Sequence, residues 1–424
     1  MGAAALMGRF HPQSLLGIAA VIALAWSLSE NRRLFPWRLV LGGLALQAAV
    51  ALVLLKVPVA RDALFALNGA VGAVTSATKA GTSFVFGFIG GGAPPFAVTD
   101  PRNLASFAFG VLPLVIVISA LSALLWHWRI LPIVIGAIAF VLRKVMGIGG
   151  AVGFGSGATI FLGMVEAPLL IRPYLPKITR SEMFVLLTVG LASVAGTVFV
   201  LYATILKPVL PGALGHILVA SMMSLPGAIM IAKIMIPGES SAEAVEGSAT
   251  LYRSSMDAVA HGSEDGLRIY LNIVAMLIVM LALVSLANSL LGFVPAIGGA
   301  PVTLERIFGW LFAPVVFLYG VPWQEAAIAG SLMGVKTILN ELIAYLKLAA
   351  LPKGSLDPRS TLIMVYGMCG FANIGSVGIM LAGMSQLVPS RRDEIVPLAL
   401  RALISGTLAS GLTGSMIGFL PIAG

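Results

Sequence analysis

The sequence predicts an all-α polytopic membrane protein with about eight transmembrane helices and two re-entrant hairpins in an inverted repeat. Three observations predict this class: 59% of the 424 residues are hydrophobic, only 10% are charged, and the mean hydropathy is +1.02. A soluble domain carries about 25% charged residues, so lipid is the expected solvent for most of this surface. The net charge of +9 comes without a basic, aromatic-rich patch, so nucleic acid is not an expected partner.

Eight apolar segments are candidates for membrane-spanning helices. They are residues 13–28, 38–55, 106–127, 181–206, 214–236, 267–294, 360–385 and 393–420. The segment 62–90 is richer in Gly, Ser and Thr, so we expect an interfacial or protein-packed helix there. Basic residues collect in the 30–38 turn and in the loops between 129 and 180. Because such loops stay in the cytoplasm, we expect an inner (plasma) membrane protein with its N-terminus outside.

Two further stretches, 131–175 and 303–347, are apolar but interrupted by glycine and by charged residues. Irregular backbone at membrane depth is tolerated only where it is buried in protein or lines a cavity. We therefore expect an interfacial helix followed by a re-entrant hairpin in the first stretch, and the same pattern in the second. Glu166 and Glu341 are expected near the tip, or early in the second arm, of their hairpins.

The two stretches resemble each other. The Gly-Ser pairs at 155–156 and 330–331 are each followed, eleven residues after the glycine, by a glutamate, and GLASVAG (190–196) is matched with GFANIGS (370–376), which pairs Ser193 with Asn373. Three predicted spans separate the repeats, and an odd number inverts them, as is typical of secondary transporters. We divide the chain into N-terminal scaffold spans, a first transport unit, a polar loop with a long scaffold span, and a second transport unit: residues 1–130, 131–236, 237–302 and 303–424.

Ionisable residues at membrane depth are costly and usually functional, which singles out Glu166, Glu341 and Lys336. A carboxylate can accept hydrogen bonds from two vicinal hydroxyls, as on a ribose, or hold a cation or a proton. Alternatively, each glutamate is a structural partner of a basic residue such as Lys336. Asn373 and Ser376 share a helix face and suit a hydroxyl-bearing ligand, although such residues also join helices.

No catalytic residues are predicted, because no nucleophile–base pair or metal cluster stands at membrane depth. There is one cysteine, Cys369, and no histidine pair with metal-ligand spacing. The chain also lacks a GxxxxGK[ST] phosphate loop, so ATP is not expected to drive it. We expect neither an enzyme nor a cofactor, apart from sodium as a possible coupling ion.

Three blocks, at residues 163–183, 320–346 and 370–379, resemble the concentrative nucleoside transporter family. The resemblance runs from about residue 30 to the C-terminus. It implies a homotrimer that imports nucleosides with sodium ions or protons, by an elevator movement of a transport domain. The alternative from a different class is a transporter-like receptor or regulator that binds a nucleoside-like ligand without concentrative transport.

The resemblance also implies roles for individual residues. Glu341 matches the ribose-binding glutamate of the second hairpin, with Asn340 beside it. Asn373 and Ser376 match a ribose-contacting pair in a broken seventh span, and Phe371 matches an aromatic residue near the ligand.

On the nucleobase side, the resemblance implies a role for Glu166 of the first hairpin and a wall residue, Val198, in the fourth span. Nucleoside-binding members typically carry Gln-Thr or Gln-Ser before that glutamate, whereas this chain has Met164 and Val165. Neither side chain can hydrogen-bond a base edge. This departure favours a larger or less polar base, or another ribosylated compound.

The implied cation site departs as well. Sodium-coupled members place an asparagine where Thr159 stands, and the remaining positions are Leu162, Ser193 and Val194. A hard cation prefers several oxygen ligands, so losing an amide oxygen weakens the site. Sodium coupling here and proton coupling through Glu166 or Glu341 both remain open.

Overall fold

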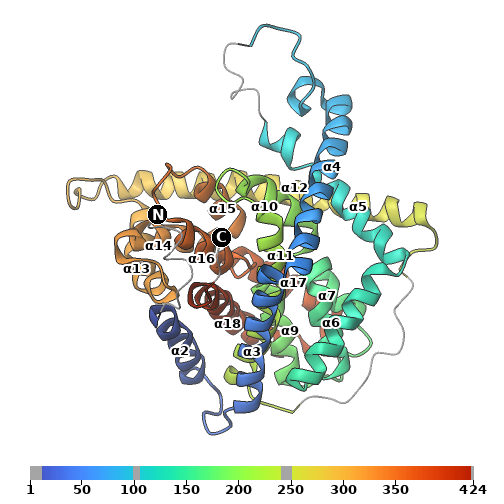
Figure 1. Cartoon of the computed structure of the whole chain (residues 1–424), viewed down its shortest axis with the longest axis vertical. Helices are drawn as coiled ribbons and strands as arrows, with labels where there is room; N and C mark the ends of the chain where they lie inside the picture. The colour runs from blue at the N-terminus through green and yellow to red at the C-terminus, as the bar shows by residue number, and fades with distance from the viewer. Residues whose placement is uncertain (1–11, 99–105, 240–250, 422–424) are drawn as a thin grey trace.

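The computed structural model describes residues 12–98, 106–239 and 251–421, and these residues confirm the all-α prediction. Within those ranges the only β-type pairing is an isolated bridge between Ile297 and Ala300. The helices (Figure 1) are α2 (Pro12–Ser27), α3 (Trp37–Lys56), α4 (Pro58–Phe86), α5 (Leu114–His127), α6 (Ile130–Met146), α7 (Gly150–Leu162), α8 (Glu166–Leu170), α9 (Arg180–Ala192), α10 (Gly196–Leu206), α11 (Ala213–Met235), α12 (Ser255–Leu291), α13 (Leu304–Tyr319), α14 (Trp323–Ile338), α15 (Glu341–Ala349), α16 (Pro358–Met368), α17 (Ile374–Leu387) and α18 (Arg392–Phe419). Single helical turns cover Gly87–Gly90, Phe107–Val111 and Pro389–Arg391.

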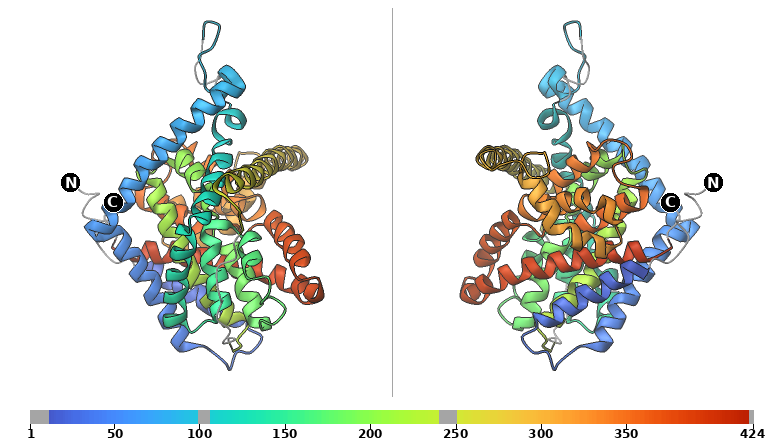
Figure 2. Two further views of the ribbon diagram at one scale, coloured as in Figure 1. Left: turned by 90° about the vertical axis from the view of Figure 1, so that its right-hand side faces the viewer. Right: turned by 90° about the vertical axis from the view of Figure 1, so that its left-hand side faces the viewer.

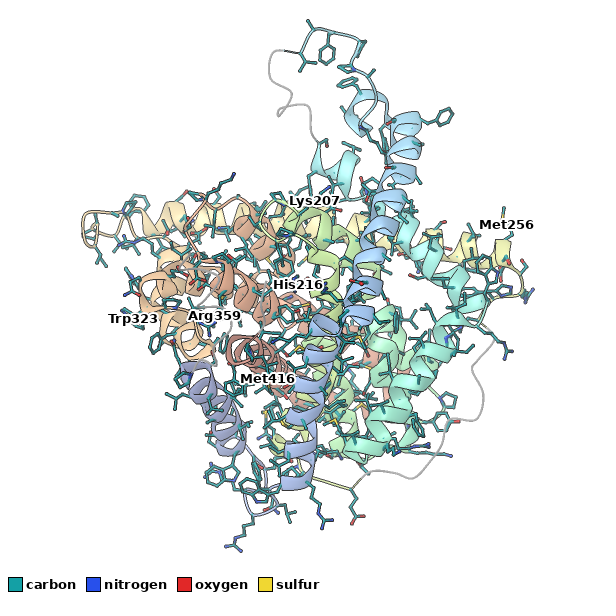
Figure 3. The ribbon with its side chains drawn as sticks, viewed as in Figure 1. Lys207, His216, Met256, Trp323, Arg359 and Met416 are labelled. Atoms are coloured by element: carbon teal, nitrogen blue, oxygen red, sulfur yellow. The ribbon has the colours of Figure 1, made fainter. Side chains whose placement is uncertain are left out.

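The core of the bundle is built from the α9–α10 pair and α11. In their most apolar windows 94% and 89% of the residues are buried, against 6% for α12. Met416 of α18 is 4% exposed inside the body, whereas Met256 at the outer end of α12 is 76% exposed (Figure 3). Large apolar side chains on the outer helices, such as Leu41, Ile133 and Ile278, are more than 60% exposed. Exposed apolar surface on this scale is expected of a protein solvated by lipid.

Six helices in the described part of the chain are long and apolar enough to cross a membrane, and the bent pair α13–α14 would make a seventh. The predicted count of about eight is therefore not confirmed. α2 has 16 residues, and the predicted span 360–385 is divided into α16 and α17. α4 has 29 residues and is not among the six, in line with the prediction for 62–90. Figure 2 shows α4 along one edge of the body, with α12 extending outward on the opposite side.

α12 begins well before the predicted span 267–294. The Ser254 side chain caps it by accepting a hydrogen bond from the Asp257 N–H at 3.1 Å. The cap replaces one of the hydrogen bonds that a helix terminus lacks. The polar residues from Ser255 onward, which were expected to form a loop, are therefore part of the helix. The rest of the predicted polar loop, residues 240–250, lies outside the described residues.

Each of the two irregular stretches contains one helix followed by two further helices that are joined at a short break. α6 packs along α7 around residues 147–149, and α13 meets α14 at 114° around residues 320–322. α6 before α7 and α8, and α13 before α14 and α15, agree with the expected order of one helix followed by a hairpin. α7 stays helical despite four glycines because 9 of its 13 residues are buried, so tertiary packing overrides propensity.

Glu166 and Glu341 lie where they were expected, at the start of the second arm of a hairpin formed by α7 and α8 or by α14 and α15. Each is the first residue of a short helix, α8 or α15, that follows α7 or α14 after a break and packs against it. Gly163 causes the first break, because its φ of +99° ends α7 in a conformation that favours glycine. Both carboxylates consequently lie beside the break between the two arms of a hairpin.

The order of elements in α6–α11 repeats in α13–α18: one helix, a hairpin whose second arm begins with glutamate, a broken helix and a long helix. The predicted spans 181–206 and 360–385 are each broken, at residues 193–195 and 369–373. The predicted register of the second block is wrong. Gly190 lies inside α9 while Gly370 lies in a break, and the position equivalent to the N-cap Asn373 is Ala195.

A charged cluster ties the loop after α2 to two core helices. Glu30 accepts hydrogen bonds from Arg180, at 2.9 Å, and from Arg401, and its own N–H donates to the Met235 carbonyl. Burial alone would raise the Glu30 pKa, but the hydrogen bonds and charges of the two arginines outweigh it and hold the pKa below 4.5. The ionised carboxylate therefore joins α9 and α18 at this end of the bundle.

Candidate substrate site

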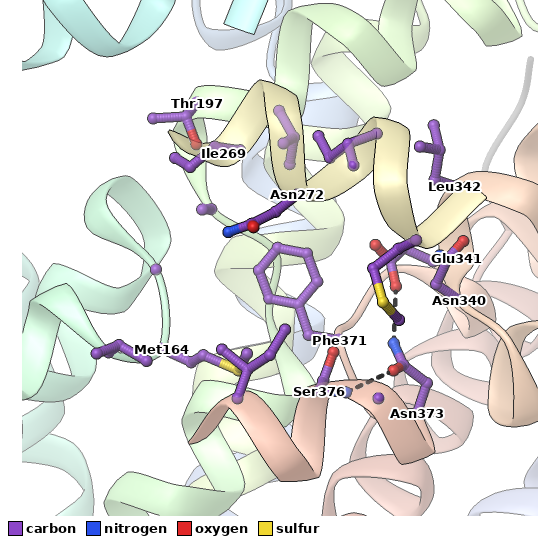
Figure 4. Close-up of a pocket in the computed structure, with 18 of the residues that line it drawn as sticks. Met164, Thr197, Ile269, Asn272, Asn340, Glu341, Leu342, Phe371, Asn373 and Ser376 are labelled. Atoms are coloured by element: carbon purple, nitrogen blue, oxygen red, sulfur yellow. Dashed lines mark hydrogen bonds between the residues drawn. The ribbon is translucent and has the colours of Figure 1, made fainter. Parts of the chain in front are cut away.

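A cavity of about 250 Å³ lies where the two breaks, the two short helices and α12 meet (Figure 4). Because buried polar groups converge on an otherwise apolar wall, it has the character of a small-molecule site. All nine residues predicted for the substrate line it: Met164, Val165, Glu166, Val198, Asn340, Glu341, Phe371, Asn373 and Ser376.

The Glu341 carboxylate is held in place from two sides. The Tyr202 hydroxyl donates to Oε1 at 2.6 Å, and Asn373 Nδ2 donates to Oε2 at 3.3 Å. Glu341 is 4% exposed, so these bonds act where little water screens them. An ionised carboxylate has about four acceptor positions, so each oxygen keeps capacity for a further donor. The arrangement can accept two hydroxyl groups from one ligand.

Two asparagines stabilise the helix ends beside this carboxylate. Asn340 Oδ1 accepts from the Ile343 N–H at 2.9 Å, and Asn373 Oδ1 accepts from the Ser376 N–H at 2.8 Å. Both are side-chain N-caps, of α15 and α17. Asn373 thus uses its oxygen to cap a helix and its nitrogen to bind Glu341, which fixes its orientation.

Lys336 is not the ion-pair partner of Glu341. In the described part of the chain no ion pair within 4.0 Å joins them, and the fully buried Lys336 Nζ has no hydrogen-bond partner. Lys336 also does not line the cavity. Tyr202 and Asn373, and not the lysine, are the direct partners of the carboxylate.

The opposite side of the cavity is less polar. Met164 and Val165 pack closely against glycines, since a Cβ atom added to Gly190 would lie 2.9 Å from Met164 Cβ and one added to Gly383 would lie 2.6 Å from Val165 Cγ1. Glu166 is exposed and lines the cavity. A Cβ atom added to Gly163 would lie 2.8 Å from its Oε2. The two carboxylates therefore occupy equivalent places in the repeat but different surroundings.

The four predicted cation residues lie where α7 ends beside the break between α9 and α10. A Cβ atom added to Gly196 would lie 3.2 Å from the Phe161 carbonyl oxygen, which shows how closely these segments approach. Leu162 also lines the cavity, whereas the other three are buried and do not line it. The four are Thr159, Leu162, Ser193 and Val194.

The two hydroxyls of this group are already engaged as donors. Thr159 Oγ1 donates to the Gly155 carbonyl at 2.9 Å, and Ser193 Oγ donates to the Val189 carbonyl at 2.8 Å. Each oxygen therefore offers only lone pairs to a further partner. Oxygen ligands without available hydrogens suit a hard cation.

Three polar lining residues were missed by the sequence analysis: Tyr202, Thr197 and Asn272. Asn272 carried a signal, because a lone amide in an otherwise apolar run is costly in a membrane. Tyr202 and Thr197 carried none, since a tyrosine and a threonine are common within apolar helices.

Three family models match the chain. They are described as Na+ dependent nucleoside transporter N-terminus, over residues 16–89, nucleoside recognition, over 108–209, and Na+ dependent nucleoside transporter C-terminus, over 216–418. The fold and the site are those of a polytopic membrane transport protein. The chain belongs to the concentrative nucleoside transporter family, as the sequence resemblance predicted.

Individual relatives agree over nearly the whole length. An uncharacterised transporter of Bacillus subtilis, YutK, is 36% identical over 95% of this chain and 98% of its own. The nucleoside permease NupC of Helicobacter pylori is 34% identical over 96% of each chain. The solved structure of CNTnw in an inward-facing substrate-bound state has a TM-score of 0.86 and 32% identity, and covers 96% of this chain and 98% of that one. These relatives are transporters and permeases, which indicates a transport role.

Proposed function

We propose that this chain is a secondary active symporter that imports nucleosides, or a related ribosylated compound. An inward gradient of sodium ions or protons drives this import. The supporting observation is the Glu341 carboxylate, held by Tyr202 and Asn373 with free acceptor positions toward the cavity. Two vicinal ribose hydroxyls match that pair of oxygens. The name of the Helicobacter pylori relative, a nucleoside permease, agrees with this substrate class.

In the proposed cycle, Glu341 and Asn373 bind the ribose and Phe371 packs against the base. A carboxylate without its full set of partners is costly to move through an apolar barrier. Substrate hydroxyls reduce that cost, so the loaded transport domain crosses more readily than the empty one. We infer an elevator movement of the two repeat units, 131–236 and 303–424, against a scaffold that includes α12.

The coupling cation is proposed to act at the first repeat. The oxygens of Thr159 and Ser193 beside the break suit sodium, whereas a proton would be carried by Glu166 or Glu341. Either ion would compensate carboxylate charge before translocation. We further propose a homotrimer in the inner membrane with its N-terminus outside.

Uptake into proteoliposomes tests the function. Purified protein is reconstituted, and accumulation of radiolabelled uridine and adenosine is followed under an inward sodium gradient, an inward proton gradient, and neither. Accumulation above equilibrium under one gradient is expected, and it identifies the ion. Entry that stops at equilibrium under both gradients would indicate a channel, and binding without entry would indicate a receptor. Either result contradicts the proposal.

A further inference from the structure

The scaffold helix α12 places one polar side chain on the cavity wall. Ile269, Asn272, Ile273 and Met276 of this helix line the cavity at helical spacing, and only Asn272 is polar. No hydrogen bond joins its amide to any part of the chain that the structure describes. Asn272 is exposed and lines the cavity, so its amide is open to a ligand there. This side chain therefore has bonding capacity that the protein itself does not use.

Thr197 of α10 is in a similar position. Several other helical threonines bond the carbonyl four residues earlier, as Thr204 does to Val200 at 2.8 Å. Thr197 is the second residue of α10, so the corresponding carbonyl belongs to Ser193 in the break, and that carbonyl accepts the Phe371 N–H at 3.2 Å. The Thr197 hydroxyl, on a side chain that is 8% exposed, has no partner among the described residues.

These two groups face the part of the cavity that lacks polar partners. In Figure 4 the Asn272 amide points away from Glu341, and the Thr197 hydroxyl lies on the same side as the amide. Met164 and Val165, from the first repeat, offer this region no side-chain hydrogen bond. A ligand whose ribose is held at Glu341 and Asn373 would extend its base toward this region.

We propose that Asn272, assisted by Thr197, reads the edge of the nucleobase and sets base specificity. This inference rests on the proposed function, since it requires that the ligand be a nucleoside. A carboxamide offers a donor and an acceptor side by side, and it pairs with a base edge of the same kind, such as the amino group and N7 of adenine. The matching ligand class is therefore a nucleoside whose base carries an adjacent donor and acceptor, with adenosine as the probe.

Equilibrium binding of two ligands to the full-length purified protein tests this assignment. Adenosine and purine riboside differ only in the exocyclic amino group. Adenosine loses two neutral hydrogen bonds in Asn272→Leu, whereas purine riboside, which keeps N7, loses one. Asn272→Leu should therefore weaken adenosine binding roughly 10- to 30-fold and purine riboside binding only roughly 3- to 5-fold. Thr197→Val should weaken adenosine by less, and Thr204→Val, a matched change in the same helix away from the cavity, should have no effect.

The possible outcomes distinguish a failure of this inference from a failure of the proposed function. If the wild-type protein binds both ligands and Asn272→Leu weakens both equally, or neither, the role of Asn272 is overturned while nucleoside binding stands. If the folded wild-type protein binds neither nucleoside, the proposed function fails and the assignment falls with it. A selective loss of adenosine binding supports both.

Discussion

Replacing Glu341 with glutamine changes one charge at the centre of the cavity and almost nothing in volume. The wild-type carboxylate accepts from the Tyr202 hydroxyl at 2.6 Å and from Asn373 Nδ2 at 3.3 Å. A glutamine oxygen can keep the bond to Tyr202, but the new amide nitrogen would then face the donor group of Asn373. The variant loses the negative charge and one of the two accepting atoms.

The size of the effect follows from the two ribose hydroxyls. A hydrogen bond to a charged group contributes about 1.5–3 kcal/mol, and one between neutral groups about 0.5–1.5 kcal/mol. Loss of charge assistance at one hydroxyl and loss of the acceptor at the other cost about 2–4 kcal/mol together, or roughly 30- to 1000-fold in Kd.

The assay is equilibrium binding of uridine or adenosine, and of the matching 2′,3′-dideoxynucleoside, to wild type and Glu341→Gln. The dideoxy ligand lacks both hydroxyls, so its affinity should hardly change between the two proteins. Glu305→Gln is the matched control, because the Glu305 carboxylate pairs with Lys347 at 2.7 Å and does not line the cavity. Equal losses for the ribose and dideoxy ligands, with folding intact, would refute the ribose assignment.

Three further predictions concern other parts of the molecule. Met164→Gln combined with Val165→Thr should raise uridine uptake relative to adenosine, and an unchanged uptake ratio would contradict our interpretation of the apolar side of the cavity. Gly370→Val should lower the melting temperature by several degrees, measured in detergent, because a Cβ there would lie 2.6 Å from the Ala192 carbonyl oxygen at the end of α9. Glu30→Gln should lower the melting temperature at pH 7, since the carboxylate pKa is below 4.5 in the folded protein. That deficit should shrink as the pH falls through the folded pKa, because the wild-type carboxylate then becomes neutral too.

The helices and the membrane class could be predicted from the sequence because both lipid and a buried core require each span to be apolar. Apolar runs of sufficient length form helices in either environment, so the runs at 214–236 and 393–420 correspond closely to α11 and α18. The carboxylates and asparagines of the site were also identifiable, since polar groups at membrane depth stand out against an apolar background.

The breaks were harder to locate from the sequence. Residues 181–206 read as one continuous apolar span, yet the chain leaves the helix at residues 193–195. That break is stabilised by a partner far away in the sequence, the Phe371 N–H, which satisfies the Ser193 carbonyl. Local helix propensity cannot predict a hydrogen bond to a residue so distant in the sequence. For the same reason Tyr202, whose role depends on Glu341 lying opposite, could not be singled out.

The two repeats have the same order of helices and breaks but differ in the residues that cap the helices. This difference explains why one side of the cavity is polar and the other apolar. In the second repeat the N-caps of α15 and α17 are Asn340 and Asn373, whose side chains bond the following turn. In the first repeat the equivalent positions of α8 and α10 are Val165 and Ala195, which make no side-chain cap. The second repeat therefore holds a carboxylate in a fixed hydrogen-bonded frame, which suits an invariant group such as ribose. The first repeat leaves its wall free of such bonds, so substitutions there can change which base is accepted without disturbing the ribose frame.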